Sequence, residues 1–240
     1  MDWSGQGFVL GLRPHGETSG ILEVMTPEHG RHAGLVRGAF GRKMSAVLMP
    51  GNQVSLVWRA RAADSLGTFG VEPLRARAAA LLGDRLALAG LSTITALISR
   101  ALPEREPHPA LYEATLTMIE ALSTLPDWPR LYLHWEAGLL NELGFGLDLT
   151  RCAVTGATEG LCYVSPRTGR AVTALGARGY EDRLLPLPSA LLTHAPSGRQ
   201  ELLEGLHLTG HFLEKGLVPN AQSRPLPEAR ARLLDLLTKA

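Results

Sequence analysis

The fold is indicated first by two short apolar runs, Phe8-Val9-Leu10-Gly11-Leu12 and Ile21-Leu22-Glu23-Val24-Met25. Turn-forming residues, among them Pro14 and Gly16, separate the two runs, as expected of two strands joined by a turn. Three similar runs follow along the chain: Ala33–Val36, Val54–Trp58 and, more weakly, residues 65–71. Five short strands with Gly and Pro punctuation are typical of a small barrel. We therefore predict an OB-fold over residues 1–72.

Leu- and Ala-rich sequence replaces this pattern after Glu72. Pro73 suits the first turn of a helix, and apolar residues recur at helical spacing from Leu81 to Ile98. Further helices are predicted at residues 111–125, 127–143, 197–216 and 227–237. Their start and stop signals are Asp127 as an N-cap, Gly144 as a terminator, and Ser197 with Gln200 as a capping box. Residues 73–240 should thus form a helical domain.

A small β island interrupts the helical region at residues 150–175. Its predicted strands are Cys152–Gly156, Leu161–Val164 and Ala171–Thr173, with a turn at Pro166–Gly169. The fold class is therefore α+β multidomain: an N-terminal OB-fold β-barrel followed by an α-helical domain that carries a small β insertion.

Composition sets the broad class of the protein. With 45% hydrophobic residues, the 240-residue chain has ample material for a core. Its only two cysteines, Cys152 and Cys162, are too few for a disulfide scaffold and suit a reducing compartment. We find no uninterrupted apolar run of about 18 residues and no signal peptide. We expect a soluble, cytoplasmic protein that does not enter membranes.

The net charge of +1 conceals an uneven distribution. Residues 1–71 carry +2, residues 72–150 carry −4 and residues 151–240 carry +3. Between residues 31 and 61 there are six cations and no Asp or Glu: Arg31, Arg37, Arg42, Lys43, Arg59 and Arg61. Phe40 adds an aromatic ring in the same loop. Cations that follow phosphates and an aromatic ring that stacks on bases are the requirements of single-strand binding. The alternative is that these cations only keep a small barrel soluble.

Two other motifs partly match known functional sites, one for phosphate binding and one for metal binding. Residues 11–18 nearly match a phosphate-binding loop, but Glu17 replaces the essential lysine, so a turn is the better interpretation. On one predicted helix, Glu204, His207, His211 and Glu214 share a face that could hold a metal. A second Glu-x-x-His motif, which a di-metal bundle requires, is absent, so a solvated face is favoured. We also find no nucleophile motif and expect no enzyme activity.

The order of these parts resembles the RecO family of DNA repair proteins over nearly the whole chain. The resemblance rests on Phe8-Val9-Leu10, Arg13-Pro14, Glu17-Thr18-Ser19, Leu22, Val24, Thr26, Gly30-Arg31, Arg37-Gly38-Ala39, Leu143-Gly144-Phe145 and Cys152. It implies an OB-fold, a helical domain and a zinc-ribbon-like island. Zinc-bearing members carry four cysteines there, whereas this chain has two, so the ligand set is incomplete and no cofactor is expected.

The resemblance also implies a function. Such a protein is a recombinational repair mediator that binds single- and double-stranded DNA and anneals complementary strands. Its implied partners are RecR and single-strand-binding protein, and with RecR it helps to load RecA, which would place it at the nucleoid. The resemblance carries DNA binding over to Arg31, Arg37, Arg42 and Lys43, while Arg59, Arg61 and Phe40 rest on the charge and aromatic pattern. The alternatives are a protein–protein scaffold and a metal enzyme using His207 and His211.

Overall fold

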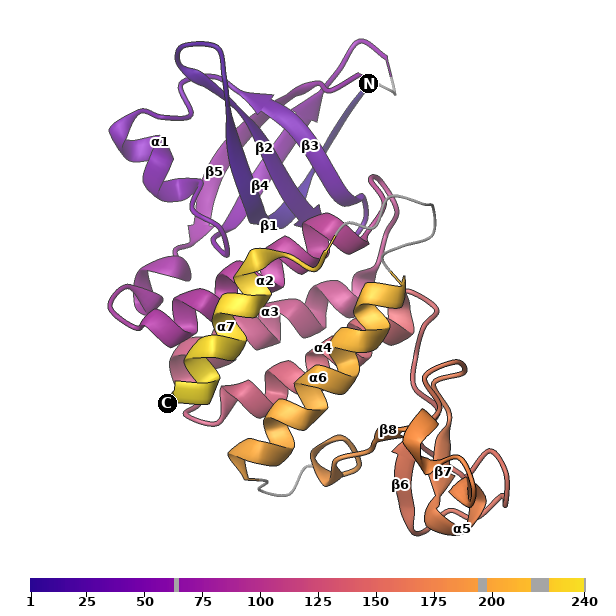
Figure 1. Cartoon of the computed structure of the whole chain (residues 1–240). Coiled ribbons are helices and arrows are strands. Elements are labelled where there is room, and N and C mark those ends of the chain that lie inside the picture. Colours follow the sequence, from indigo (N-terminus) through magenta and orange to yellow (C-terminus); the bar gives the residue numbers. More distant parts are fainter. Residues whose placement is uncertain (63–64, 194–197, 217–224, 240) are drawn as a thin grey trace. The chain divides into compact units, whose positions relative to one another are not determined.

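Five strands close into a barrel at the N-terminus of the computed structural model (Figure 1). The structure describes residues 1–62, 65–193, 198–216 and 225–239. The strands lie in the order β1-β2-β3-β5-β4, with bounds β1 Asp2–His15, β2 Ser19–Thr26, β3 Gly30–Val36, β4 Gln53–Arg59 and β5 Thr68–Arg75. The predicted OB-like fold is confirmed, and so are all five strands, although β1 begins earlier than expected.

The length of β1 allows the barrel to close. Its first half pairs with β4 from Asp2 to Phe8, and its second half pairs with β2 from Phe8 to His15. A register shift between Val9 and Gly11 bends the strand between these two partners. The sequence resembling a phosphate-binding loop forms the end of β1 (residues 11–15) and the turn to β2 (residues 16–18), with Gly16 at φ +69°, as the turn interpretation predicts.

The end of β5 differs from the prediction. Pro73 does not begin a helix but lies in β5, opposite Val54 of β4. A register shift between Gln53 and Val54 occurs at this position, and a proline without an N–H group is tolerated at such an irregularity. On its other side, β5 pairs with β3 only through Leu35 and Thr68. The short helix α1 (Arg42–Val47) lies in the connection from β3 to β4.

Helices α2 and α3 belong to the same compact unit as the barrel. This N-terminal unit comprises Met1–Pro126, and the C-terminal unit comprises Asp127–Ala240. A domain boundary at residues 72/73 therefore stays a prediction. The 3-10 helix η1 (Ala78–Leu81) precedes α2 (Arg85–Ala101) and α3 (Pro109–Thr124). The side chain of Asp84 caps α2 by accepting from the N–H groups of Leu86 and Ala87, which explains why α2 begins later than Leu81.

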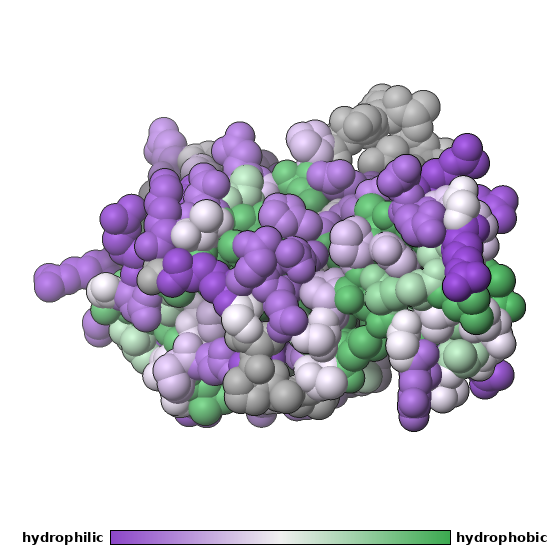
Figure 2. Space-filling view, turned by 60° about the horizontal axis from the view of Figure 1, so that its bottom comes forward, coloured by the Kyte–Doolittle hydropathy of each residue, from purple (hydrophilic) through white to green (hydrophobic). Residues whose placement is uncertain are grey.

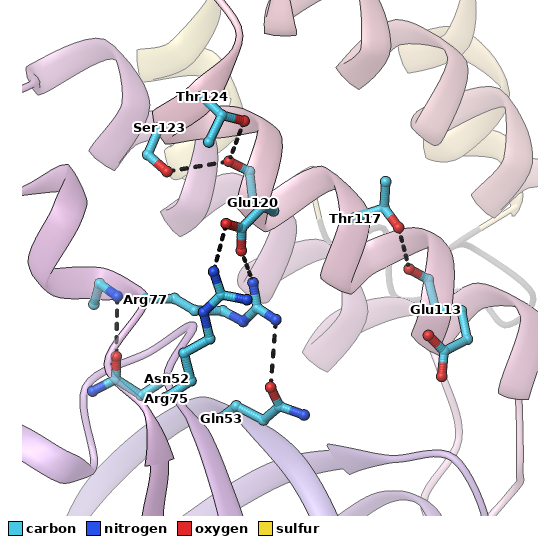
Figure 3. A network of polar contacts seen from close by, with 10 residues as sticks. Asn52, Gln53, Arg75, Arg77, Glu113, Thr117, Glu120, Ser123 and Thr124 are labelled. Carbon is cyan, nitrogen blue, oxygen red and sulfur yellow. Dashed lines mark hydrogen bonds and ion pairs between the residues drawn. The ribbon is translucent and has the colours of Figure 1, made fainter.

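A polar network joins α3 to the end of the barrel (Figure 3). The carboxylate of Glu120 on α3 accepts hydrogen bonds from Arg75, at 2.7 Å, and from Arg77. Nearby, Oδ1 of the buried Asn52 accepts from the N–H of Ala78 at 3.0 Å, while its Nδ2 donates to the carbonyl oxygens of Ala46 and Val47. Asn52 thereby ties α1 to η1.

The C-terminal unit contains three long helices and the β island. The helices are α4 (Trp128–Glu142), α6 (Arg199–Gly216) and α7 (Glu228–Lys239), and α6 packs against both α4 and α7. The predicted helices at 127–143, 197–216 and 227–237 are confirmed to within a few residues. Asp127 occupies the N-cap of α4 without a side-chain cap bond, and Gly144 follows the helix at φ +79°. The predicted cap Ser197 lies outside the described residues.

The island is a three-stranded sheet in the order β7-β6-β8. Strands β6 (Leu161–Val164) and β7 (Ala171–Thr173) are confirmed, and β8 (Leu185–Pro186) was not predicted. The prediction of a strand at Cys152–Gly156 is wrong. These residues form a turn, closed by hydrogen bonds from Cys152 N to Ala157 O and from Gly156 N to Cys152 O. The short elements α5 (Ala174–Ala177), η2 (Glu181–Arg183) and η3 (Ser189–Leu191) complete this region.

The surface mixes hydrophilic and hydrophobic side chains. On the face shown in Figure 2, hydrophilic side chains project around smaller hydrophobic areas. Among the described residues, no helix has the length and apolar character needed to cross a membrane.

Candidate nucleic-acid interface

Five of the six predicted cations are exposed on the barrel. Arg37 directly follows β3, Arg42 and Lys43 begin α1, Arg59 ends β4 and Arg61 follows it. Within the described part of the chain, none of the five has an ion-pair partner. Their charges are therefore available to an external anion.

A groove of about 600 Å³ brings two of these cations together. Arg37 and Arg59 both line it, one from each side of the junction between β3 and β5. The rest of its lining is largely apolar and includes Val36, Met44, Val57, Phe69 and Val71. Arg42, Lys43, Arg61 and Phe40 do not line the groove, although Arg42 and Lys43 directly precede Met44 in α1. The groove can accept a ligand that is partly apolar and partly anionic.

Arg31 has a different environment. Its side chain is only 17% exposed, forms an ion pair with Glu23, and lies 3.6 Å from a carboxylate oxygen of Glu104. Its Nε also donates to the carbonyl oxygen of Leu102 at 2.9 Å. The absence of acidic residues between positions 31 and 61 thus does not leave Arg31 without a counter-charge, because its partners come from β2 and from the segment after α2. Arg31 joins the barrel to that segment.

The aromatic side chain in the groove is not the one that the sequence pattern favoured. Phe40 is 45% exposed and lies outside the groove lining, whereas Phe69 contributes to the lining although it is only 6% exposed. Phe69, Gly70, Met44 and Val57 were not predicted as groove residues. Phe69 and Gly70 belong to the least regular of the five strand patterns, and Met44 and Val57 carry no charge or exposed ring that would mark a binding residue.

The histidines of α6 border pockets on the surface of the C-terminal unit. His207 and His211 are exposed and line a pocket of about 450 Å³ with Glu214 and Arg230. Glu204 lines a separate, smaller pocket that His207 also borders. Across the described residues, no group of three or more His, Cys, Asp or Glu side chains is placed to hold a metal ion.

Comparisons with known proteins give the family. The model described as "Recombination protein O N terminal" matches residues 1–77, which include the whole barrel. The model described as "Recombination protein O C terminal" matches residues 82–225. The chain belongs to the RecO family.

Curated relatives in this family carry the name DNA repair protein RecO. The protein of Cereibacter sphaeroides is 55% identical over 240 residues, covering 100% of both chains. That of Dinoroseobacter shibae is 51% identical over 240 residues, covering 100% of this chain and 99% of the relative. That of Paracoccus denitrificans is 52% identical over 238 residues, covering 99% and 97%. The recognition of a RecO-type DNA repair protein from sequence is confirmed.

The zinc implied by the RecO resemblance does not fit the island of this chain. The buried Sγ of Cys152 already accepts hydrogen bonds from the N–H groups of Thr155 and Thr173, both at 3.3 Å, and from Thr173 Oγ1 at 3.5 Å. Burial raises the pKa of the Cys152 thiol, but these hydrogen bonds outweigh it and lower the pKa to about 6. Sγ of Cys162 instead lies 3.9 Å from Val172 O. Such N–H donors stabilise a thiolate and do not themselves exclude a metal. The misfit lies in the ligand set, because a structural zinc needs four ligands and, among the described residues, no group of three or more His, Cys, Asp or Glu side chains is placed to hold a metal ion.

Proposed function

We propose that this RecO-family protein binds single- and double-stranded DNA through its barrel and anneals complementary strands. The observation that carries the proposal is the groove lined by Arg37 and Arg59, with Arg42, Lys43 and Arg61 exposed on the same barrel and without an ion-pair partner among the described residues. Exposed cations are suited to contact the phosphates of a nucleic acid strand, and an apolar groove beside them is suited to contact its bases.

Annealing by this protein requires no covalent chemistry. Arginine and lysine side chains neutralise phosphates and thereby lower the repulsion between two strands. A protein that holds both strands also raises their effective concentration. We therefore infer a non-enzymatic role, in which the protein acts at the nucleoid with RecR and single-strand-binding protein and helps RecA to load onto covered DNA. The RecO family membership supports these partners.

Salt-dependent binding tests the DNA-binding surface. Each phosphate contact on a single strand contributes about −0.7 to the slope of log K against log salt. The triple variant Arg37→Ala, Arg42→Ala, Lys43→Ala should therefore bind more weakly and flatten the slope by about 2. A matched control removes three exposed arginines of the C-terminal unit, Arg178, Arg183 and Arg232, and should leave the slope nearly unchanged. Equal slopes for the first variant and the wild type would overturn the assignment of this surface.

An annealing assay separates the proposal from a pure scaffold. Complementary oligonucleotides without other proteins should anneal faster with the wild-type protein than alone, and the triple variant should lose most of this acceleration. A protein that only docks other proteins would leave the spontaneous rate unchanged.

A further inference from the structure

Gly70 occupies an unusual position for a strand glycine. It lies within β5, opposite Val57 of β4, and it is exposed in the wall of the groove. Its backbone is not in the positive-φ region, so the local conformation does not require glycine. A Cβ added there would approach only Val57, at 3.8 Å, which is ordinary van der Waals contact. The fold therefore tolerates a side chain at position 70, and the absence of one leaves the groove open.

The surroundings of Gly70 define what could occupy this space. Val57 is 37% exposed and forms an apolar surface beside the glycine. Arg59 and Thr68 pair with each other two residues further along β4 and β5, and Arg37 lines the groove directly after β3. A strand glycine beside exposed apolar surface permits close approach of a flat ligand. The cations at the rim add a preference for negative charge.

The edge of β5 offers polar contacts as well. From Phe69 to Arg75, β5 pairs with β4 but, among the described residues, forms no residue pair with β3, whose pairing with β5 is limited to Leu35 and Thr68. Backbone groups on this side of the strand can thus donate to or accept from a ligand in the groove. These contacts suit the polar edge of a planar ring whose face rests on apolar surface.

We propose that the groove binds one unpaired nucleobase of a DNA strand, which lies over Gly70 and Val57 while Arg37 and Arg59 contact phosphates on either side of it. The inference rests on the proposed DNA binding and specifies the ligand of that site. A paired base is stacked inside a duplex and cannot enter the groove, so this subsite favours single strands. Contact with a ring face is compatible with any base, so sequence preference should be small.

Abasic DNA distinguishes this subsite from phosphate binding alone. We compare a short single-stranded oligonucleotide with a strand of equal length and charge that lacks its bases. Apolar contact with the face of one base is expected to make the wild-type protein bind the normal strand about tenfold more tightly. Gly70→Leu should weaken binding of the normal strand about tenfold and leave binding of the abasic strand unchanged, because the new side chain fills only the base site.

Two further variants keep the test independent of folding. Gly70→Ala, whose Cβ meets nothing closer than 3.8 Å, should give an intermediate loss of the preference for the normal strand. Gly11→Leu is the matched control, because Gly11 is a strand glycine of β1 outside the groove and an added Cβ there would meet nothing within 4 Å. It should keep the full preference. Equal affinity of the wild type for both strands overturns the base subsite but leaves DNA binding intact. No binding of either strand overturns the proposed function itself.

Discussion

Arg230 and Glu136 form a doubly hydrogen-bonded ion pair inside the C-terminal unit, with 2.7 Å between Nε and Oε1 and 2.9 Å between Nη2 and Oε2. Glu136 on α4 is fully buried and Arg230 on α7 is 4% exposed. The same carboxylate accepts from Thr209 of α6 at 2.6 Å and from the hydroxyl of Tyr132. One acidic side chain thus connects all three long helices of this unit.

Removing one member of this pair should strongly destabilise the protein. Arg230→Met leaves the Glu136 carboxylate buried without its counter-charge, which typically costs about 3–5 kcal/mol. The double variant Arg230→Met, Glu136→Gln removes both charges and should be less destabilised than Arg230→Met alone. Urea unfolding of each variant measures these differences. Arg232→Met, on an exposed position of the same helix, is the control and should change the free energy of unfolding by less than about 0.5 kcal/mol. If Arg230→Met has the same free energy of unfolding as the wild type, the ion pair does not stabilise the packing of α7.

Arg31 and Arg37 should respond differently to substitution although they are six residues apart in one cationic run. Arg31→Ala removes the hydrogen bond to Leu102 O and leaves Glu23 without its ion-pair partner, so the free energy of unfolding should fall by about 1–3 kcal/mol. The salt slope of DNA binding should stay near that of the wild type. Arg37→Ala should leave stability unchanged and flatten the slope by about 0.7. If Arg31→Ala instead flattens the slope at unchanged stability, Arg31 belongs to the DNA contact surface.

The low pKa of Cys152 predicts a pH-dependent stability. The thiol has a pKa of about 6 in the folded protein and an ordinary value of about 8.5 in the unfolded chain. Between these two values the unfolded state binds more protons, so the free energy of unfolding should rise as the pH increases from 6 to 8.5. The contribution is complete above the unfolded pKa and is lost as the pH falls through 6.

Cysteine variants isolate this effect. Cys152→Ala should flatten the pH profile of unfolding over this interval, whereas Cys162→Ala, which lacks the N–H donors around Cys152, should preserve it. A profile of Cys152→Ala that runs parallel to the wild type would contradict a thiolate at position 152.

Local patterns predicted most of the secondary structure, because apolar periodicity and turn residues act over a few positions. This is why the strands of the barrel and the long helices were placed to within a few residues. Pro73 was assigned to a helix because its role depends on the irregular pairing between β4 and β5, which no local pattern contains. The turn at Cys152–Gly156 was read as a strand because Cys, Val and Thr favour strands, and it is fixed instead by hydrogen bonds to its own sulfur and backbone.

The sequence predicted the cations of the candidate site but not its groove. A run of cations is visible in the sequence, and five of them are exposed without an ion-pair partner in the part of the chain that the structure describes. The ion pair of Arg31 with Glu23 depends on the register of β2 and β3, and its hydrogen bond to Leu102 O joins residues 71 positions apart, so charge counting along the chain could not find either contact. The groove is lined by residues of β3, β4, β5 and α1 and by Arg37 after β3, and none of these segments reveals it alone.

Asn52 links the stability of the barrel to the placement of α1. Its Nδ2 donates to Ala46 O at 2.9 Å and to Val47 O at 3.2 Å, at the end of the helix that presents Arg42 and Lys43. None of the residues of α1 is fully buried, although Met44 and Val47 pack against the barrel core, and the hydrogen bonds from Asn52 add a constraint on the end of the helix. Asn52→Ala also leaves the buried N–H of Ala78 without its acceptor, which should lower the free energy of unfolding by about 1–3 kcal/mol.

Loosening α1 should also weaken DNA binding at conditions where the variant is still folded. Asn52→Ala should reduce affinity for a single strand several-fold while leaving the number of cations, and hence most of the salt slope, intact. Ser45→Ala is the control within α1, because its exposed hydroxyl bonds only to Arg42 O at 3.3 Å, and it should change neither quantity appreciably. Fluorescence anisotropy with labelled oligonucleotides at several salt concentrations, beside urea unfolding, measures both effects. Full affinity in Asn52→Ala would show that α1 is positioned without Asn52.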